Sequence, residues 1–110
     1  MEVLFATRKL QRRLNSMAEL RKAYGDPMAR KIALRLQQMS AARHLGDLRN
    51  LPGRWHELTG DLQDCLACDL AGPYRLIFRP TEESPPRSAG GGLDWSAVDS
   101  VTVTDIDDYH

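Results

Sequence analysis

The chain has 110 residues, 42% of them hydrophobic, and a formal net charge of zero. That length and hydrophobic fraction are enough for one compact core and not for two, so we expect a single domain over residues 1–110. No apolar run approaches the length of a membrane-spanning helix, and residues 1–5 lack the basic, apolar and small-residue order of a signal peptide. These features argue against a membrane protein and predict a cytoplasmic one.

Charge is unevenly distributed along the chain. Residues 1–56 contain 12 Lys and Arg against 4 Asp and Glu, and residues 57–110 contain 3 against 11, so the two parts carry +8 and −8. This asymmetry is compatible with one face that meets an anionic partner and another that meets a basic one. It is equally compatible with two basic helices that lie on an acidic sheet.

The first residues predict a strand followed by a helix. Residues 3–6 form a short apolar run typical of a strand, and Thr7 is a suitable N-cap for the helix that follows. The buried face of that helix is predicted from apolar residues at intervals of three and four: Leu10, Leu14, Met17, Leu20 and Tyr24. Gly25 is typical of a residue that ends a helix.

A second helix is predicted to begin at Asp26, as N-cap, with Pro27 in the first turn, where the missing N–H of proline is not needed. Its predicted buried stripe is Met28, Ile32, Leu36 and Met39. The polar side chains expected in water are Arg30, Lys31, Arg35 and Gln38. The turn between the two helices is so short that we expect them to be antiparallel neighbours.

Strands dominate the rest of the chain. Residues 44–53 form a compact connection, in which Leu45, Leu48 and Leu51 are expected to enter the core. Turn residues then separate four predicted strands, at residues 54–59, 65–71, 73–79 and 101–110.

Residues 81–94 are rich in proline and glycine and carry no periodicity. We expect a flexible loop there, either a lid over a site or a disordered hairpin tip. The predicted order of elements is β-α-α-β-β-β-β. This is an α+β fold in which two N-terminal helices pack on one face of a small, mostly antiparallel sheet and leave the other face partly open.

Cys65 and Cys68 have a spacing that is common in metal and redox sites. On a helix the two thiols would share a face, but this segment is predicted to be a strand, where positions i and i+3 face opposite ways. The pair then cannot chelate a metal or form a disulfide. We expect two small, largely apolar side chains in a reducing compartment, and no metal or cofactor.

The predicted last strand ends on three side chains capable of chemistry, Asp108, Tyr109 and His110. Alternation directs Asp108 and His110 to one side and Tyr109 to the other, unless a bulge intervenes. A carboxylate beside an imidazole is a candidate acid–base pair. The alternative is a solvated acidic tail that ends in histidine.

His56 and Arg75 also lie on predicted strands. Alternation allows both to face the uncovered side of the sheet together with Asp108 and His110. The ordinary alternatives are a half-buried strand histidine and an arginine that pairs with the acidic end of the chain.

Four segments together resemble a known family. They are Asp47–Gly53, Arg54–Asp61, Pro73–Phe78 and Asp108–His110. In order and spacing, over nearly the whole chain, they resemble the HigB (plasmid maintenance killer) branch of the RelE/ParE toxin superfamily. Residues 91–95 resemble a subgroup with a longer loop before the last strand.

The resemblance implies the toxin of a type II toxin–antitoxin system, with a RelE-like fold. Such a toxin is a ribosome-dependent, metal-independent mRNA endonuclease that acts in the ribosomal A site. A HigA-like helix-turn-helix antitoxin inhibits it and mediates any contact with operator DNA. Position by position, the resemblance implies that His56 and His110 are the acid and base, that Asp108 orients one of them, that Arg75 binds phosphate, and that Tyr109 stacks on a base or donates a hydrogen bond.

The sequence departs from this family at several positions. Thr59 stands where relatives usually have lysine, and Leu62-Gln63-Asp64 stands where they have basic residues and a glycine. Asp105 and Asp107 add negative charge near the catalytic end, and RNA affinity depends on neutralising phosphates. A second hypothesis is therefore a non-catalytic or gyrase-directed binding protein that acts in repressor assembly.

Overall fold

The computed structural model describes residues 1–108, and three α-helices and five strands make up most of this part. The helices are α1 (Arg8–Leu14), α2 (Met17–Tyr24) and α3 (Asp26–Ala41). The strands are β1 (Glu2–Phe5), β2 (His56–Glu57), β3 (Leu66–Asp69), β4 (Tyr74–Pro80) and β5 (Ser100–Asp108). Short 3₁₀ turns are η1 (Leu45–Leu48), η2 (Gly60–Leu62) and η3 (Trp95–Ala97).

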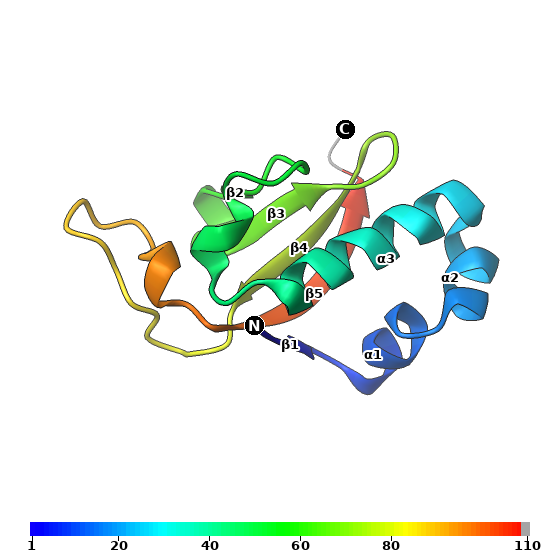
Figure 1. Cartoon of the computed structure of the whole chain (residues 1–110), viewed down its shortest axis with the longest axis horizontal. Helices are drawn as coiled ribbons and strands as arrows, with labels where there is room; N and C mark the ends of the chain where they lie inside the picture. The colour runs from blue at the N-terminus through cyan, green and yellow to red at the C-terminus, as the bar shows by residue number, and fades with distance from the viewer. Residues whose placement is uncertain (109–110) are drawn as a thin grey trace.

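The five strands form one mixed sheet in the order β1-β5-β4-β3-β2. β1 is parallel to β5, and the other neighbours are antiparallel. The helices lie on one side of this sheet, and α3 runs across it (Figure 1). The α+β architecture predicted from the sequence is confirmed, with three helices in place of two.

The first predicted helix is in fact two helices, so that prediction was wrong at residues 15–16. α1 ends at the C-cap Asn15, whose N–H donates to the Gln11 carbonyl. Ser16 then begins a new helix, because its hydroxyl accepts from the Glu19 N–H at 3.2 Å. A serine N-cap followed by a glutamate at the third helical position is a strong start signal. The predicted N-cap at Thr7 is confirmed, since its hydroxyl accepts from the Leu10 N–H at 3.1 Å.

Gly25 both ends α2 and caps α3, with a φ of +84° that favours glycine. Asp26, predicted as the N-cap, is instead the first residue of the helix. Its carboxylate accepts from the Arg21 and Arg30 guanidinium groups. These hydrogen bonds lower the pKa of Asp26 and join the end of α2 to the start of α3.

The core lies between the helices and the covered face of the sheet. Its fully buried members include Leu20, Ile32, Met39, Leu66, Leu76, Phe78, Val101 and Val103. The prediction that Leu45 and Leu48 enter the core is confirmed, because neither side chain is exposed. The same prediction was wrong for Leu51, which is 40% exposed.

β5 contains a bulge. Phe78 pairs with Val103 and Ile77 with Asp105, which leaves Thr104 as an extra residue in β5. The Thr104 hydroxyl donates to the Ile77 carbonyl at 3.2 Å. An extra residue reverses the alternation of side chains. Odd-numbered residues of β5 face the core before the bulge, and even-numbered residues face it after the bulge.

The predicted loop at residues 81–94 extends beyond the end of the sheet (Figure 1) and is held at defined points. The Arg87 guanidinium donates to the Asp64 carboxylate at 2.6 and 2.9 Å, and Arg87 forms an isolated backbone bridge with Leu93. Leu93 is buried. The flexibility of this loop stays a prediction.

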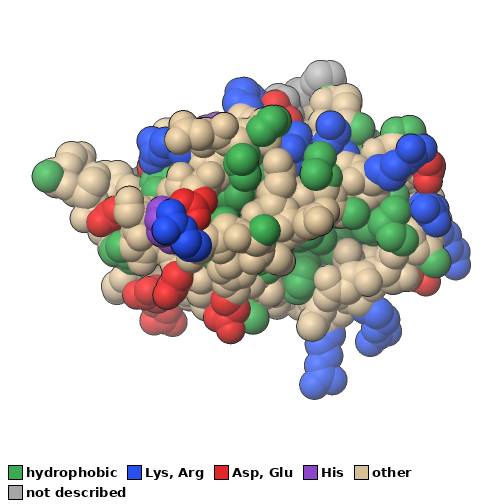
Figure 2. Space-filling view, viewed as in Figure 1, with side chains coloured by type: hydrophobic (Ala, Val, Ile, Leu, Met, Phe, Trp, Pro, Cys, Tyr) green, Lys and Arg blue, Asp and Glu red, His purple; other side chains and the backbone are tan. Residues whose placement is uncertain are grey.

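Lys and Arg side chains project from the helical part of the face in Figure 2. The exposed Lys and Arg residues of the three helices are Arg8, Lys9, Arg12, Arg21, Lys22 and Arg30. Within residues 1–108, α3 and the shorter helices all lack the length and apolar content required to cross a bilayer.

Candidate functional site

His56 and Arg75 lie on the face of the sheet that the helices leave uncovered. His56 pairs with Ala67, and Arg75 pairs with Asp69. Leu76, next to Arg75 on β4, and Cys68, between the partners Ala67 and Asp69 on β3, belong to the core and therefore point the other way. β3 separates the two side chains, and His56 is in register with Ile77, two residues from Arg75 along β4, so their backbones are roughly 12 Å apart. The register thus places these two residues on the same face, as alternation allowed, and their role as a site stays a prediction.

A hydrogen bond defines the tautomer of His56. Its Nδ1 lies 2.6 Å from the Arg54 carbonyl oxygen. A carbonyl oxygen only accepts, so Nδ1 carries the proton and Nε2 of the neutral ring holds the free electron pair. The side chain is half-buried. This arrangement gives His56 a proton acceptor on the open face.

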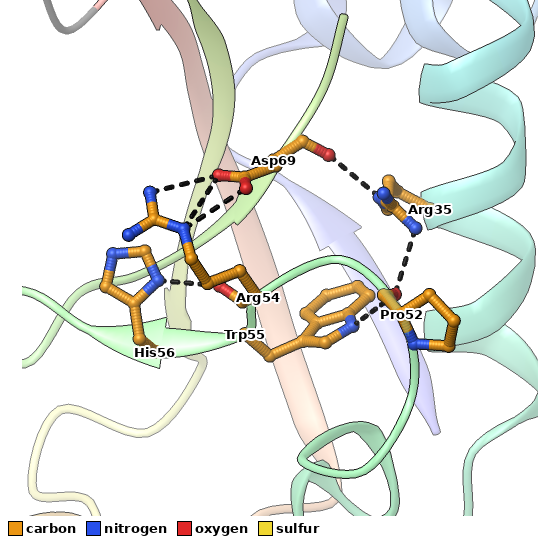
Figure 3. A network of polar contacts seen from close by, with 6 residues as sticks. All are labelled: Arg35, Pro52, Arg54, Trp55, His56 and Asp69. Carbon is orange, nitrogen blue, oxygen red and sulfur yellow. Dashed lines mark hydrogen bonds and ion pairs between the residues drawn. The ribbon is translucent and has the colours of Figure 1, made fainter.

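Arg54 shapes this part of the site, and the sequence did not indicate it. Its φ is +51°, an unusual conformation for a residue with a side chain. Its guanidinium donates to the Asp69 carboxylate at 3.1 Å (Figure 3). Pro52-Gly53 indicates a turn at this point, but a left-handed arginine after it has no signal in the sequence.

Arg35 supports the same turn from α3. It was predicted to lie in water, and that prediction was wrong, because the residue is only 5% exposed. Its Nε donates to the Asp69 carbonyl at 2.8 Å and one terminal nitrogen donates to the Pro52 carbonyl at 3.0 Å. Trp55 Nε1 donates to the same Pro52 carbonyl at 3.2 Å (Figure 3). These acceptors come from other segments, and they explain the burial of a charged group.

Gly53 is required where Arg35 and Trp55 meet. Its φ is +131°, and an added Cβ would lie 2.9 Å from both Arg35 Cζ and Trp55 Nε1. Arg35, the turn and Asp69 therefore form one network that ends at the His56 ring.

Arg75 is paired with a carboxylate of β5. Its Nε lies 2.8 Å from Asp107 Oδ1, and a second nitrogen lies 3.4 Å from Oδ2. Asp69 is also in register with Arg75. The open face therefore presents both an imidazole and a guanidinium, with carboxylates beside the guanidinium.

Asp108 does not share this face. The bulge places Asp107 opposite Arg75 and Asp108 opposite Tyr74. Tyr74 lies two residues before the core residue Leu76 on β4, so both face the helical side of the sheet. Asp108 is in register with Tyr74 and therefore faces that side too. This differs from the predicted grouping of Asp108 with His56 and Arg75. Tyr109 and His110 lie outside the described residues.

The positions where the sequence differs from the family that it resembles have neutral or acidic side chains. Thr59 is exposed, and Asp64 is paired with Arg87, which lowers the pKa of Asp64. Asp105 is exposed and in register with Ile77 on the open face.

The two cysteines are free thiols on opposite faces of the sheet segment around β3. Burial raises the pKa of Cys68 to about 12 and also raises that of Cys65. Among residues 1–108, no three His, Cys, Asp or Glu side chains are grouped as a metal site.

The sequence matches no protein-family model and no curated protein at a significant level. The structure is similar over its whole length to a YoeB/ParE toxin from Agrobacterium tumefaciens, with a TM-score of 0.58 and 12% identity. The alignment covers 100% of both chains. At this identity the likeness establishes the fold alone. The chain therefore has the α+β fold of RelE/ParE-like toxins, with three helices packed on a five-stranded mixed sheet.

Proposed function

We propose that this protein is the toxin of a type II toxin–antitoxin system, of the HigB type, and that it cleaves mRNA in the A site of the ribosome. One observation carries the proposal. His56, with its proton fixed on Nδ1 by the Arg54 carbonyl, shares an uncovered sheet face with Arg75. The RelE/ParE-like fold and the family resemblance support it.

The proposed reaction needs no metal. Nε2 of His56 removes the proton from a ribose 2′-OH, and the oxygen attacks the adjacent phosphorus. The bond from phosphorus to the 5′ oxygen breaks, and His110 protonates that leaving oxygen. The products are a 2′,3′-cyclic phosphate and a 5′-hydroxyl. The tautomer of His56 supports its role as base, and Tyr109 keeps the stacking role implied by the resemblance. Asp108 is directed toward the helical side, so it is not placed to orient His56.

Arg75 is the proposed ligand of the reacting phosphate. A guanidinium remains charged and matches phosphate geometry, so it stabilises the additional negative charge of the transition state. Without RNA, the Asp107 carboxylate accepts a hydrogen bond from this guanidinium. The phosphate must therefore displace or share that contact when RNA binds.

The partners follow from the same proposal. The basic helical side chains provide a surface for ribosomal RNA, since exposed Lys and Arg gain affinity by neutralising phosphates. A HigA-like antitoxin inhibits the toxin and is the route of any contact with operator DNA. The cytoplasm, where mRNA is translated, is the proposed location.

Translating ribosomes loaded with a defined mRNA provide the test, with primer extension to map cuts. The wild type is expected to give discrete A-site cuts that disappear with His56→Ala and with deletion of His110. His44→Ala is the matched control, because His44 lies in the connection before η1, outside the proposed site, and its loss should leave the cuts unchanged. A wild type that leaves the mRNA intact would overturn the proposal.

The carboxylates on the open face favour a second function. Asp69 and Asp107 flank Arg75, and Asp105 is exposed on the same face, which opposes RNA binding. A gyrase-directed or non-catalytic protein that acts in repressor assembly tolerates such a face. DNA cleavage complexes with purified gyrase, or growth inhibition without nucleic-acid damage, would support this second function.

A further inference from the structure

β2 carries His56 and is the shortest strand of the sheet. It consists of His56 and Glu57, lies at the edge, and within residues 1–108 pairs with β3 alone. Backbone hydrogen bonds flank it, from the Leu58 N–H to the Cys65 carbonyl at 2.9 Å and from the Asp69 N–H to the Gly53 carbonyl at 2.8 Å. In so short an edge strand, side-chain contacts add to what holds it in place.

Glu57 provides such contacts on the side opposite to His56. Its Oε2 accepts from Trp95 Nε1 at 3.0 Å, and its Oε1 accepts from the Leu93 N–H at 3.3 Å. Both donors belong to the segment that returns from the loop at residues 81–94. The two oxygens of one carboxylate thus join the edge strand to a segment more than 30 residues away in sequence.

The donors are themselves firmly placed. Trp95 is 6% exposed and Leu93 is 4% exposed. The Arg49 guanidinium carbon lies 4.0 Å from the centroid of the Trp95 ring, within the range of a cation–π contact. The Leu45 N–H donates to the Val98 carbonyl at 2.8 Å, which joins η1 to the end of η3. The returning segment is therefore a rigid support for Glu57.

We propose that Trp95 and Glu57 form a latch that fixes β2 and so positions His56 for proton transfer. This proposal rests on the proposed function of His56 as base. Trp95 is a positioning residue, since it acts through Glu57 and the backbone of β2. The long loop before β5 then has a defined purpose, which is to bring Trp95 to the edge strand.

Trp95→Phe tests the latch, because it deletes the N–H donor and keeps an aromatic ring beneath Arg49. The ring nitrogens of ¹⁵N-labelled His56 are followed by NMR in the full chain. In the wild type the two nitrogens should show one tautomer, protonated at Nδ1. In Trp95→Phe they should shift toward the average of two tautomers, while circular dichroism shows that the protein stays folded, with a melting temperature lowered by the lost ring volume and hydrogen bond. On translating ribosomes, kcat should fall about tenfold with little change in KM.

Arg87→Gln is the matched control. It removes another side-chain anchor of the same loop, the exposed pair with Asp64, without removing a donor to Glu57. Its His56 signals should match those of the wild type. Equal changes in both variants would mean that general loosening of the loop is responsible, and unchanged His56 signals in Trp95→Phe would exclude the latch. Either result would overturn the proposal.

The two proposals fail in distinguishable ways. If the wild type cleaves no mRNA but Trp95→Phe still changes the His56 tautomer, the proposed nuclease function fails and the latch stands. If Glu57→Gln also shifts the His56 signals, the carboxylate is confirmed as the intermediary, because an amide offers one acceptor oxygen for two donors. If Glu57→Gln leaves them unchanged, the latch is overturned.

Discussion

Arg75 and Asp107 form a two-point ion pair between β4 and β5, with Nε 2.8 Å from Oδ1. The two side chains are 18% and 31% exposed, so solvent screens the pair only partly. A phosphate that binds Arg75 competes with this carboxylate. Asp107 is therefore expected to restrain RNA binding at the open face.

Asp107→Asn should increase affinity for single-stranded RNA. The guanidinium loses one competing carboxylate, which favours its contact with a phosphate, so we expect about a threefold lower Kd at low salt, in line with a partly exposed ion pair. The plot of log affinity against log salt concentration should steepen by up to about 0.7. Fluorescence anisotropy with a 2′-O-methyl RNA, which cannot be cleaved through its 2′ oxygen, measures both.

Asp105→Asn is the control for Asp107→Asn. It makes the same change in net charge on the same strand and face, but Asp105 accepts from the Ile106 N–H and forms no ion pair with Arg75. Its effect on Kd should be clearly smaller. Equal effects would mean that overall charge, and not release of Arg75, governs binding.

Arg35→Met should destabilise the fold. The carbonyls of Asp69 and Pro52 lose a charged donor inside the protein, which costs about 3 kcal/mol of unfolding free energy. Urea denaturation followed by circular dichroism measures the loss. Arg30→Met on the same helix is the control, because Arg30 is an exposed member of an ion pair and should change stability by less than about 1 kcal/mol. A similar loss in both variants would contradict the role of Arg35.

Ser16→Ala should lower stability by about 1 kcal/mol, because it removes the hydroxyl that caps α2. Thermal unfolding gives the change, and Thr7→Ala should behave alike at the start of α1. Ser40→Ala is the control, since Ser40 lies exposed near the end of α3 and alanine favours helix there. An unchanged melting temperature for Ser16→Ala would argue that α1 and α2 do not depend on this cap.

Asp47 should contribute to stability in a pH-dependent way. Hydrogen bonds from the Arg43 side chain and backbone lower the pKa of Asp47 from 3.8 to about 2. A carboxyl group whose pKa is lower in the folded state stabilises the protein above its unfolded pKa, and this contribution disappears as the pH falls through its folded pKa. The stability difference between the wild type and Asp47→Asn should therefore be constant above about pH 5, fall as the pH passes through about 2, and vanish near pH 1. A difference that persists undiminished at pH 1 would contradict the assignment.

Local patterns in the sequence were sufficient for much of the fold. The cap at Thr7 and the stop at Gly25 depend on neighbouring residues, and the structure has both. The break at Ser16 also had a local signal, the serine followed by Glu19, but the continuous apolar spacing across it predicted one helix. Where two local signals compete, periodicity alone does not decide.

The site depended on contacts that a single sequence does not contain. Arginine is usually solvated, so the burial of Arg35 becomes predictable only when the carbonyls of Pro52 and Asp69 are known to meet it. Asp107, and not Asp108 as predicted, lies beside Arg75 because of the bulge, and the bulge depends on how β5 pairs with β4. The face shared by His56 and Arg75 was predictable because no bulge interrupts the pairing between them.

The position of β5 has a consequence for biosynthesis. This strand follows all the others in the chain, yet it lies between β1 and β4 in the sheet. During translation β1 therefore has no partner until residues 100–108 leave the ribosome, and β4 has only one. The sheet cannot be completed before β5 has emerged, so the open face that holds Arg75 is assembled only after the other four strands have been synthesised.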